Sequence, residues 1–306
     1  MFTNPVPDIC PPLNPRYLRE YWEQKKRERS VNSGVVSSAQ YWSNVSTVRE
    51  VYQKQRASDT WSRKVQSQIE ELKILSGSQV LDIGAGTGTL AVSLATRGCR
   101  VTAIEPSLPM REGFLANERE AGVSDIRIIP QRWEDISEQE LGGPFDAVIA
   151  SYSLTMTDIG AAIAKMQACC TGTVHLFWFL TPPSWARVSY ALWPKLHGAN
   201  YTGEPLADCL WQVLNEMGIR ANLTAEHPKS PTRYALIDDV VAEYRQRLNC
   251  STAKQDACLL EWFEKNLVRS ADGYELPGNS RGAHIWWNVT DSPQGSARDK
   301  PSGGKY

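Results

Sequence analysis

The spacing of hydrophobic residues changes near residue 79. Before it, apolar and aromatic residues in 40–75 recur at near-helical spacing, which predicts two helices, and the charged stretch 15–29 predicts another. After it, short apolar runs alternate with helical patterns, as is typical of a parallel sheet covered on both faces. The predicted strands are 79–84, 101–106, 126–130, 145–153, 173–179, 221–226 and 283–289. The predicted helices beside them are 88–97, 107–121, 158–169, 186–193, 205–217, 236–248 and 252–268. The pattern therefore predicts an α/β fold.

Composition excludes several classes of protein. The 306 residues include 33 Lys and Arg and 34 Asp and Glu, and the net charge of −1 argues against a uniform basic surface for nucleic acid or an anionic membrane. No stretch approaches the ~20 apolar residues that span a bilayer, and the Pro-rich start lacks a secretory pattern, so we expect a cytoplasmic protein. The seven cysteines form no CxxC pair and no tight cluster with histidine, so we expect no metal site.

A glycine-rich turn follows the first predicted strand, in the run VLDIGAGTGTL. Glycine permits a positive φ and close approach of a ligand, so we expect Gly84, Gly86 and Gly88 to leave backbone N–H groups free for a ligand anion. Glu105 ends the second predicted strand, where a carboxylate can accept hydrogen bonds from both hydroxyls of a ribose. The pattern indicates a nucleoside-binding βαβ unit.

The run VLDIGAGTGTL, followed by VTAIEPS, QRWEDI and FDAVIASYSL, resembles class I S-adenosylmethionine-dependent methyltransferases. The resemblance implies a Rossmann-like, seven-stranded, mostly parallel sheet whose last strand is antiparallel. It also implies an enzyme whose cofactor is S-adenosyl-L-methionine and whose product is S-adenosyl-L-homocysteine. The implied cofactor-binding residues are Asp82, Gly84, Ala85, Gly86, Gly88, Glu105, Pro106, Trp133, Glu134, Ser151 and Tyr152.

The resemblance also implies individual roles. Glu105 would hold the ribose, and Asp82 would orient the turn or reach the methionine amino group through water. Trp133 and Glu134 would meet the adenine edge, and Pro106 would flank the adenine. Ser151 and Tyr152 would lie beneath the sulfonium. The alternatives are that Asp82 only caps the turn and that Trp133 only packs on the surface.

Two other functions share these motifs. An NAD(P)-dependent oxidoreductase also uses a glycine-rich turn and an acidic strand end, although the third and fourth motifs favour the methyltransferase. A cofactor-binding scaffold without catalytic activity would retain the same residues.

The motifs do not identify the methyl acceptor, because methyl transfer from a sulfonium needs alignment and exclusion of water more than a particular base. We expect a small molecule, with a partner protein as the alternative. The catalytic candidates are His197, Tyr152 and Asp158, although His197 could be structural and Asp158 could cap a helix. The candidate pocket residues, which could instead form interdomain core, are Tyr41, Trp42, Tyr52, Trp61, Met156, Trp185, Trp193 and Tyr201.

The predicted organisation has three parts: an N-terminal arm and helical cap (1–75), a methyltransferase domain (76–290) and a disordered tail (291–306). Within the domain, we expect an insertion at about 180–218 to form a substrate lid and helices at about 236–268 to lie between the last two strands. The basic run KKRER (25–29) is interrupted by glutamate, which predicts a solvated helix face.

Overall fold

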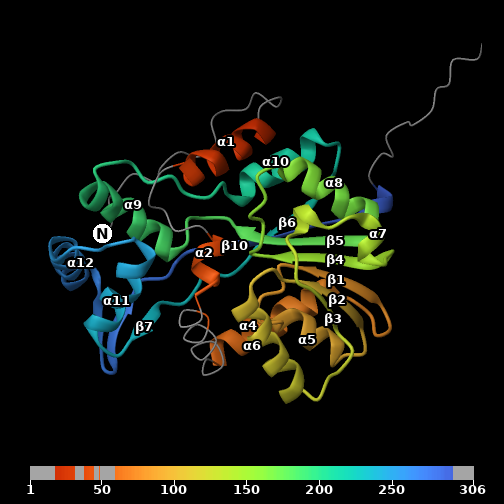
Figure 1. The fold of residues 1–306 in the computed structure, drawn as a ribbon, viewed down its shortest axis with the longest axis horizontal. Coiled ribbons are helices and arrows are strands. Elements are labelled where there is room, and N and C mark those ends of the chain that lie inside the picture. The colour runs from red at the N-terminus through yellow and green to blue at the C-terminus, as the bar shows by residue number, and fades with distance from the viewer. Residues whose placement is uncertain (1–17, 32–37, 45–47, 49–58, 292–306) are drawn as a thin grey trace, which may run out of the picture.

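The computed structural model describes residues 18–31, 38–44, 48 and 59–291, and a seven-stranded sheet lies at its centre (Figure 1). The strand order is β3-β2-β1-β4-β5-β10-β6. β10 pairs antiparallel with β5 and β6, whereas β3, β2, β1, β4 and β5 pair in parallel. The prediction of an α/β fold with an antiparallel last strand is therefore confirmed. The strands are β1 (Gln79–Ile83), β2 (Arg100–Ile104), β3 (Arg127–Ile129), β4 (Phe145–Ser151), β5 (Cys170–Phe179), β6 (Asn222–Ala225) and β10 (Gly282–Asn288).

Helices cover both faces of this sheet (Figure 1). One buried cluster lies between the sheet and α1, α8 and α10, and it includes the fully buried Trp22, whose Nε1 donates to the carbonyl oxygen of Met156 at 3.0 Å. A second cluster lies on the other face, under α4, α5 and α6, and includes the fully buried Phe114. No helix in the described ranges is long and apolar enough to cross a membrane. The helices are α1 (Leu18–Val31), α2 (Ser38–Trp42), α4 (Asp59–Leu72), α5 (Thr89–Ala95), α6 (Leu108–Glu120), α7 (Glu138–Leu141), α8 (Ile159–Cys169) and α10 (Ala207–Glu216).

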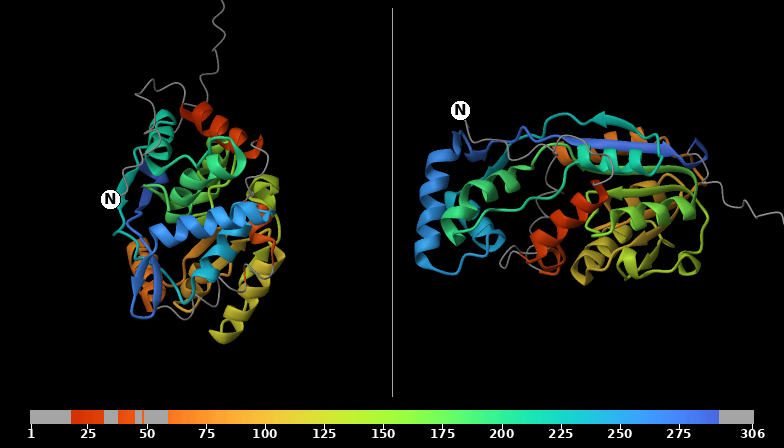
Figure 2. Two further views of the ribbon diagram at one scale, coloured as in Figure 1. Left: turned by 90° about the vertical axis from the view of Figure 1, so that its left-hand side faces the viewer. Right: turned by 90° about the horizontal axis from the view of Figure 1, so that it is seen from above.

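A third buried cluster lies outside the sheet, among α9 (Ser184–His197), α11 (Ile237–Arg247) and α12 (Ala253–Asn266). These helices lie at one end of the molecule in both views that show its long axis (Figures 1 and 2). The region also contains a small antiparallel sheet, β7-β9-β8, which was not predicted because its strands are only three or four residues long. Its strands are β7 (Thr232–Tyr234), β8 (Val268–Ser270) and β9 (Gly273–Leu276).

The segment 180–218 does not pack as one unit. α9 belongs to the third cluster, whereas Leu210 and Val213 of α10 are buried in the first cluster, beside α1. The two helices therefore have separate packing partners, and α10 covers the sheet.

The basic run on α1 departs from the predicted solvated face. Lys26 is only 8% exposed, and its Nζ contacts the Glu204 carboxylate at 2.5 Å and donates to the carbonyl oxygen of Leu154 at 2.9 Å. Arg29 Nε contacts the same carboxylate at 2.9 Å. Trp22, Lys26 and Arg29 stand four and three residues apart, so they share the inward face of the helix.

Candidate active site

The three turn glycines have φ angles of +69°, +60° and +76°, in the left-handed region that favours glycine. The expectation that they leave N–H groups free was wrong, because each N–H has an acceptor within the protein. Gly84 donates to Ile104 O at 2.8 Å, Gly86 to Glu105 Oε2 at 2.8 Å and Gly88 to Ala85 O at 2.9 Å.

The space around these glycines separates their roles. A Cβ on Gly84 would collide with the Ser153 side chain, and a Cβ on Gly88 would lie 2.6 Å from the Phe114 ring. A Cβ on Gly86 would meet only Met110 Sδ, at 4.0 Å. Gly84 and Gly88 are thus required by packing, whereas Gly86 leaves open space where a ligand can approach the backbone.

Glu105 faces this turn from the end of β2. Its carboxylate accepts the N–H of Ser107 at 2.7 Å on Oε1 and that of Gly86 on Oε2, and its residue is 6% exposed. Burial raises the pKa of Glu105, while the two backbone N–H groups act in the opposite direction. Asp82, in β1, is 2% exposed, and burial followed by the charge of Glu105 raises its pKa to about 7. Pro106, next to Glu105, is exposed.

Trp133 and Glu134 lie in the short 3-10 helix η2 (Trp133–Asp135). The Trp133 ring is 3% exposed, its Nε1 donates to Ala162 O at 3.3 Å, and Lys165 Nζ lies 4.2 Å from the ring centroid. The structure therefore places this ring in the core rather than at the expected adenine edge. Glu134 is on the surface and pairs with Arg132 at 2.7 Å.

Tyr152 follows β4, whose last residue Ser151 is half-buried. The φ angle of Tyr152 is +55°, an uncommon value for a residue with a side chain, and the Tyr152 hydroxyl donates to Glu226 Oε2 at 2.5 Å. The next residue, Ser153, donates its hydroxyl to Ile83 O at 2.5 Å. This bond joins the loop after β4 to the end of β1, beside the glycine turn.

The structure gives His197 and Asp158 structural contacts. Nε2 of His197 lies 2.8 Å from Leu248 O, and its ring centroid is 4.1 Å from that of Trp193, within the third cluster. Asp158 accepts the N–H of Ala161 at 2.8 Å and caps α8. His197 is therefore a structural residue and Asp158 is a helix cap, and these contacts do not support a catalytic role for either.

The predicted aromatic pocket residues do not form one group. Met156 is buried in the first cluster, and Trp193 and Tyr201 are buried in the third. Trp185 is half-buried beside the third cluster. Tyr52 lies outside the described residues, and Trp61 is described only through its backbone, in α4.

Tyr41 and Trp42, in α2, connect the loop after β2 with the helical end of the molecule. Ser107 Oγ donates to Trp42 O at 2.6 Å, and Arg247 Nη2 donates to the Tyr41 hydroxyl at 2.6 Å. The loop after β2 and helix α11 are therefore linked through two adjacent aromatic residues.

Tyr152 is surrounded by Lys64, Glu226 and Lys229, none of which was predicted from the sequence. Glu226 ends the predicted strand 221–226, so a carboxylate at a strand end was an available signal. Lys64 and Lys229 carry no local pattern that separates them from ordinary surface lysines.

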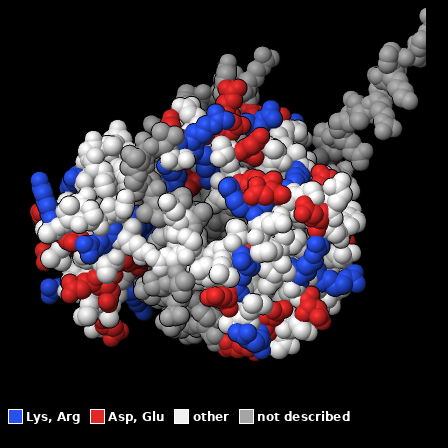
Figure 3. Space-filling view, viewed as in Figure 1, with Lys and Arg blue, Asp and Glu red and all other residues white. Residues whose placement is uncertain are grey.

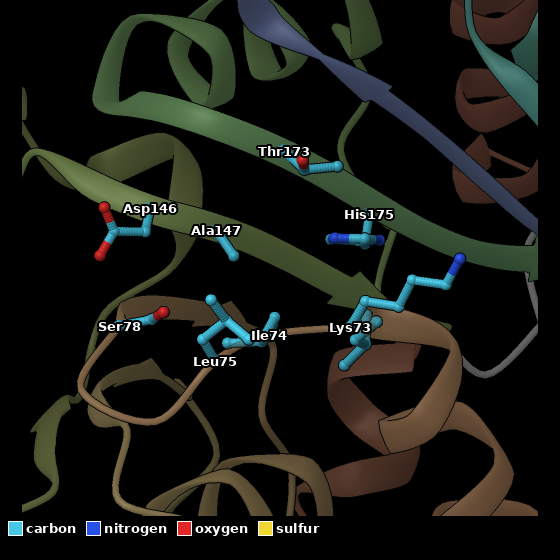
Figure 4. A pocket seen from close by; sticks show the side chains of 9 residues that line it. Lys73, Ile74, Leu75, Ser78, Asp146, Ala147, Thr173 and His175 are labelled. Carbon is cyan, nitrogen blue, oxygen red and sulfur yellow. The ribbon is translucent and has the colours of Figure 1, made fainter.

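A cavity of about 140 Å³ lies at the other end of the sheet (Figure 4). Ser78 and Asp146 lie toward one side of it and Lys73 and His175 toward the other. His175 Nδ1 is 3.0 Å from His284 Nε2, and burial lowers their pKa values to about 3 and about 4. Both imidazoles are therefore neutral near pH 7, and the cavity is separate from the glycine turn.

Charges of both signs are mixed over the face shown in Figure 3. Among the described residues, no group of three or more His, Cys, Asp or Glu side chains could hold a metal ion. Cys169 and Cys170 are buried, and burial raises their pKa values to about 12 and about 11.

Comparisons with known proteins agree with this geometry. Residues 80–172 match the family described as methyltransferase domain. YcgJ of Bacillus subtilis shares the fold, with a TM-score of 0.50 at 14% identity over 74% of this chain and 98% of that protein. An uncharacterized protein of Haemophilus influenzae is 26% identical over 226 residues, covering 73% of this chain and 81% of that protein.

A ubiquinone biosynthesis O-methyltransferase of Xylella fastidiosa is 36% identical over 96 residues, which are 31% of this chain and 37% of that enzyme. The chain thus spans little more than a third of that enzyme's length. The region that matches the methyltransferase family, residues 80–172, contains the glycine turn and Glu105. Residues 80–172 of the chain therefore carry a methyltransferase domain.

Proposed function

We propose that the protein transfers the methyl group of S-adenosylmethionine to a small molecule, at the carboxyl ends of β1, β2 and β4. The observation that carries the proposal is the buried Glu105 carboxylate, fixed by two backbone N–H groups beside the open space at Gly86. An acceptor-only group in this position suits the two hydroxyls of a ribose. The residues present therefore fit the cofactor.

The chain's own residues have a limited chemical task. The bound cofactor supplies the activated methyl group and its leaving group. The glycine turn and Glu105 hold one reactant, and the loop at Tyr152 and Ser153 brings acceptor-side residues next to that turn. Alignment of this kind lowers the barrier without a dedicated base. A small acceptor is supported by the name of the Xylella relative, which describes an O-methyltransferase of ubiquinone biosynthesis.

The test is calorimetric titration of S-adenosylhomocysteine into the wild type and Glu105→Ala. We expect the variant to bind more weakly by about 1–3 kcal/mol, because the hydrogen bonds to the ribose are lost. Glu112→Ala, which removes an exposed carboxylate from α6, is the matched control and should bind like the wild type. Equal affinity in a folded Glu105→Ala protein would contradict the ribose assignment. Binding of NAD(P) in place of S-adenosylhomocysteine would favour the oxidoreductase.

A further inference from the structure

Three segments far apart in the chain bring polar side chains together around Tyr152. α4 contributes Lys64 and Gln68, and the segment after β6 contributes Glu226 and Lys229. Tyr152 itself stands directly after β4. The group therefore lies at the carboxyl ends of the strands, on the side of the glycine turn.

The Glu226 carboxylate in this group accepts hydrogen bonds from neutral donors, and the Glu71 carboxylate of α4 lies nearby. Tyr152 Oη donates to Glu226 Oε2 at 2.5 Å, and Gln68 Nε2 donates to Glu226 Oε1 at 3.4 Å. Burial and the charge of Glu226 raise the pKa of Tyr152, so its hydroxyl remains a donor. A Cβ on Gly282 would collide with both the Tyr152 hydroxyl and the Glu226 carboxylate. The close packing of the backbone at Gly282 thus holds this pair in place.

The two lysines lie over the Tyr152 ring. Lys64 Nζ is 4.6 Å and Lys229 Nζ is 4.4 Å from the ring centroid, and Lys229 Nζ is 5.4 Å from that of Phe179. In the part of the chain that the structure describes, no carboxylate lies within 4 Å of Lys229 Nζ. Burial, followed by the charge of Lys64, lowers the pKa of Lys229 to about 8. Lys229 thus lies beside a second ammonium group, and its nearby carboxylate, Glu226, already accepts two neutral donors, which favours the arrival of a further anion at Lys229.

We propose that Lys229, together with Lys64, binds an anionic group of the methyl acceptor, with the Tyr152 and Phe179 rings beside its apolar body. The group is a carboxylate or a phosphate, which offer the same charged oxygens to an ammonium. The site lies beside the methyl donor's turn because Ser153, next to Tyr152, packs against Gly84. The inference that the bound anion belongs to the methyl acceptor rests on the proposed function. The substrate class is a small organic acid or phosphate ester.

The test uses three probes of similar shape: benzoate, phenyl phosphate and the neutral benzamide. Each is titrated calorimetrically into the full-length protein, once with and once without saturating S-adenosylhomocysteine. We expect benzoate or phenyl phosphate to bind the cofactor-loaded protein at least tenfold more tightly than benzamide, and the tighter of the two identifies the anion. Lys229→Met should weaken that binding at least tenfold, and Lys229→Arg should retain it. Lys73→Met, an exposed lysine at the other end of the sheet, is the matched control and should bind within twofold of the wild type.

Equal binding of benzoate, phenyl phosphate and benzamide would overturn the proposal, as would unchanged anion binding by Lys229→Met. Anion binding that disappears when S-adenosylhomocysteine is added would show that the lysines bind the cofactor's carboxylate, and it too would overturn the proposal. The S-adenosylhomocysteine titration is read separately. If S-adenosylhomocysteine does not bind but the anion does, the proposed function and the assignment of the anion to the acceptor are rejected. The anion site itself is then still supported.

Discussion

Asp82 and Glu105 are two buried carboxyl groups near the carboxyl ends of the neighbouring strands β1 and β2, where Asp82 pairs with Ala103 in the parallel register. Both were predicted from the sequence, because a strand, a glycine turn and a helix are local features whose residues follow one another in the chain. Trp133 was misplaced for a different reason: its motif fixes the position of the backbone, whereas the direction of the ring depends on α8. Glu226 had a signal in its place at a strand end, but its contact with Tyr152, 74 residues away in the chain, carried none, and Lys229 had no signal at all.

The raised pKa of Asp82 gives a prediction at the scale of one residue. Because its folded-state pKa, about 7, exceeds the ordinary value of 3.8, its contribution to stability is fully present below pH 3.8 and is lost as the pH rises to about 7. Asp82→Asn should therefore gain stability relative to the wild type by about 1.4 kcal/mol per pH unit across that window. Urea unfolding at a series of pH values without cofactor measures this difference.

Asp272→Asn, which changes an exposed aspartate, provides the control and should follow the wild type at every pH. If the unfolding free energies of Asp82→Asn and the wild type run parallel from pH 4 to 7, the carboxyl is not held protonated by the fold.

At the scale of elements, the glycine turn combines packing with ligand approach. The apolar runs predicted most of the large sheet, because parallel strands buried on both faces are nearly continuous in hydrophobicity. They did not predict β7, β8 and β9, which are only three or four residues long, nor the inward face of α1, where Lys26 and Arg29 are polar. On α1, hydrophobic spacing fails because Lys26 and Arg29 pair with Glu204 on the face that would otherwise be apolar.

Alanine substitutions in the turn separate its two tasks. Gly86→Ala and Gly88→Ala both place a side chain at positive φ, at a cost of about 1–2 kcal/mol. Gly88→Ala also forces a Cβ to 2.6 Å from the Phe114 ring, so its unfolding free energy should fall by about 1–3 kcal/mol more than that of Gly86→Ala. Gly86→Ala should instead weaken S-adenosylhomocysteine binding more than Gly88→Ala does, relative to the unfolding free energy that each variant loses.

Urea unfolding and calorimetry on the two variants measure these effects. Gly198→Ala, at φ +68° with open space around it, reports the backbone strain alone. Equal destabilisation by all three substitutions would show that Phe114 yields without cost.

At the scale of the whole molecule, Glu204 joins two parts of the structure that are far apart in sequence. It binds Lys26 and Arg29 of α1, and Arg29 also donates to the Tyr201 hydroxyl at 2.7 Å. The partners are unequal: when Lys26 is removed, Glu204 retains Arg29, whereas removal of Glu204 leaves Lys26 buried without a carboxylate. The connection therefore depends more on the acid than on either base.

Glu204→Gln should lower the free energy of unfolding by about 3 kcal/mol or more, because breaking a buried pair leaves an uncompensated charge. Lys26→Met keeps the apolar stem and should cost clearly less. Urea unfolding of the two single variants and the double variant measures the coupling. A larger loss for Lys26→Met than for Glu204→Gln would contradict the assignment of Glu204 as the shared partner.

The position of β10 between β5 and β6 has a consequence for biosynthesis. A ribosome makes this strand after every other strand of the structure, yet the strand is internal in the sheet. During translation, β5 has no neighbour on one side until residues 282–288 emerge, and Gly282 reaches Tyr152 and Glu226 only then. The glycine turn and Glu105 can therefore assemble on the nascent chain. The site of Lys64 and Lys229 around Tyr152 forms only after almost the whole described chain has been synthesised.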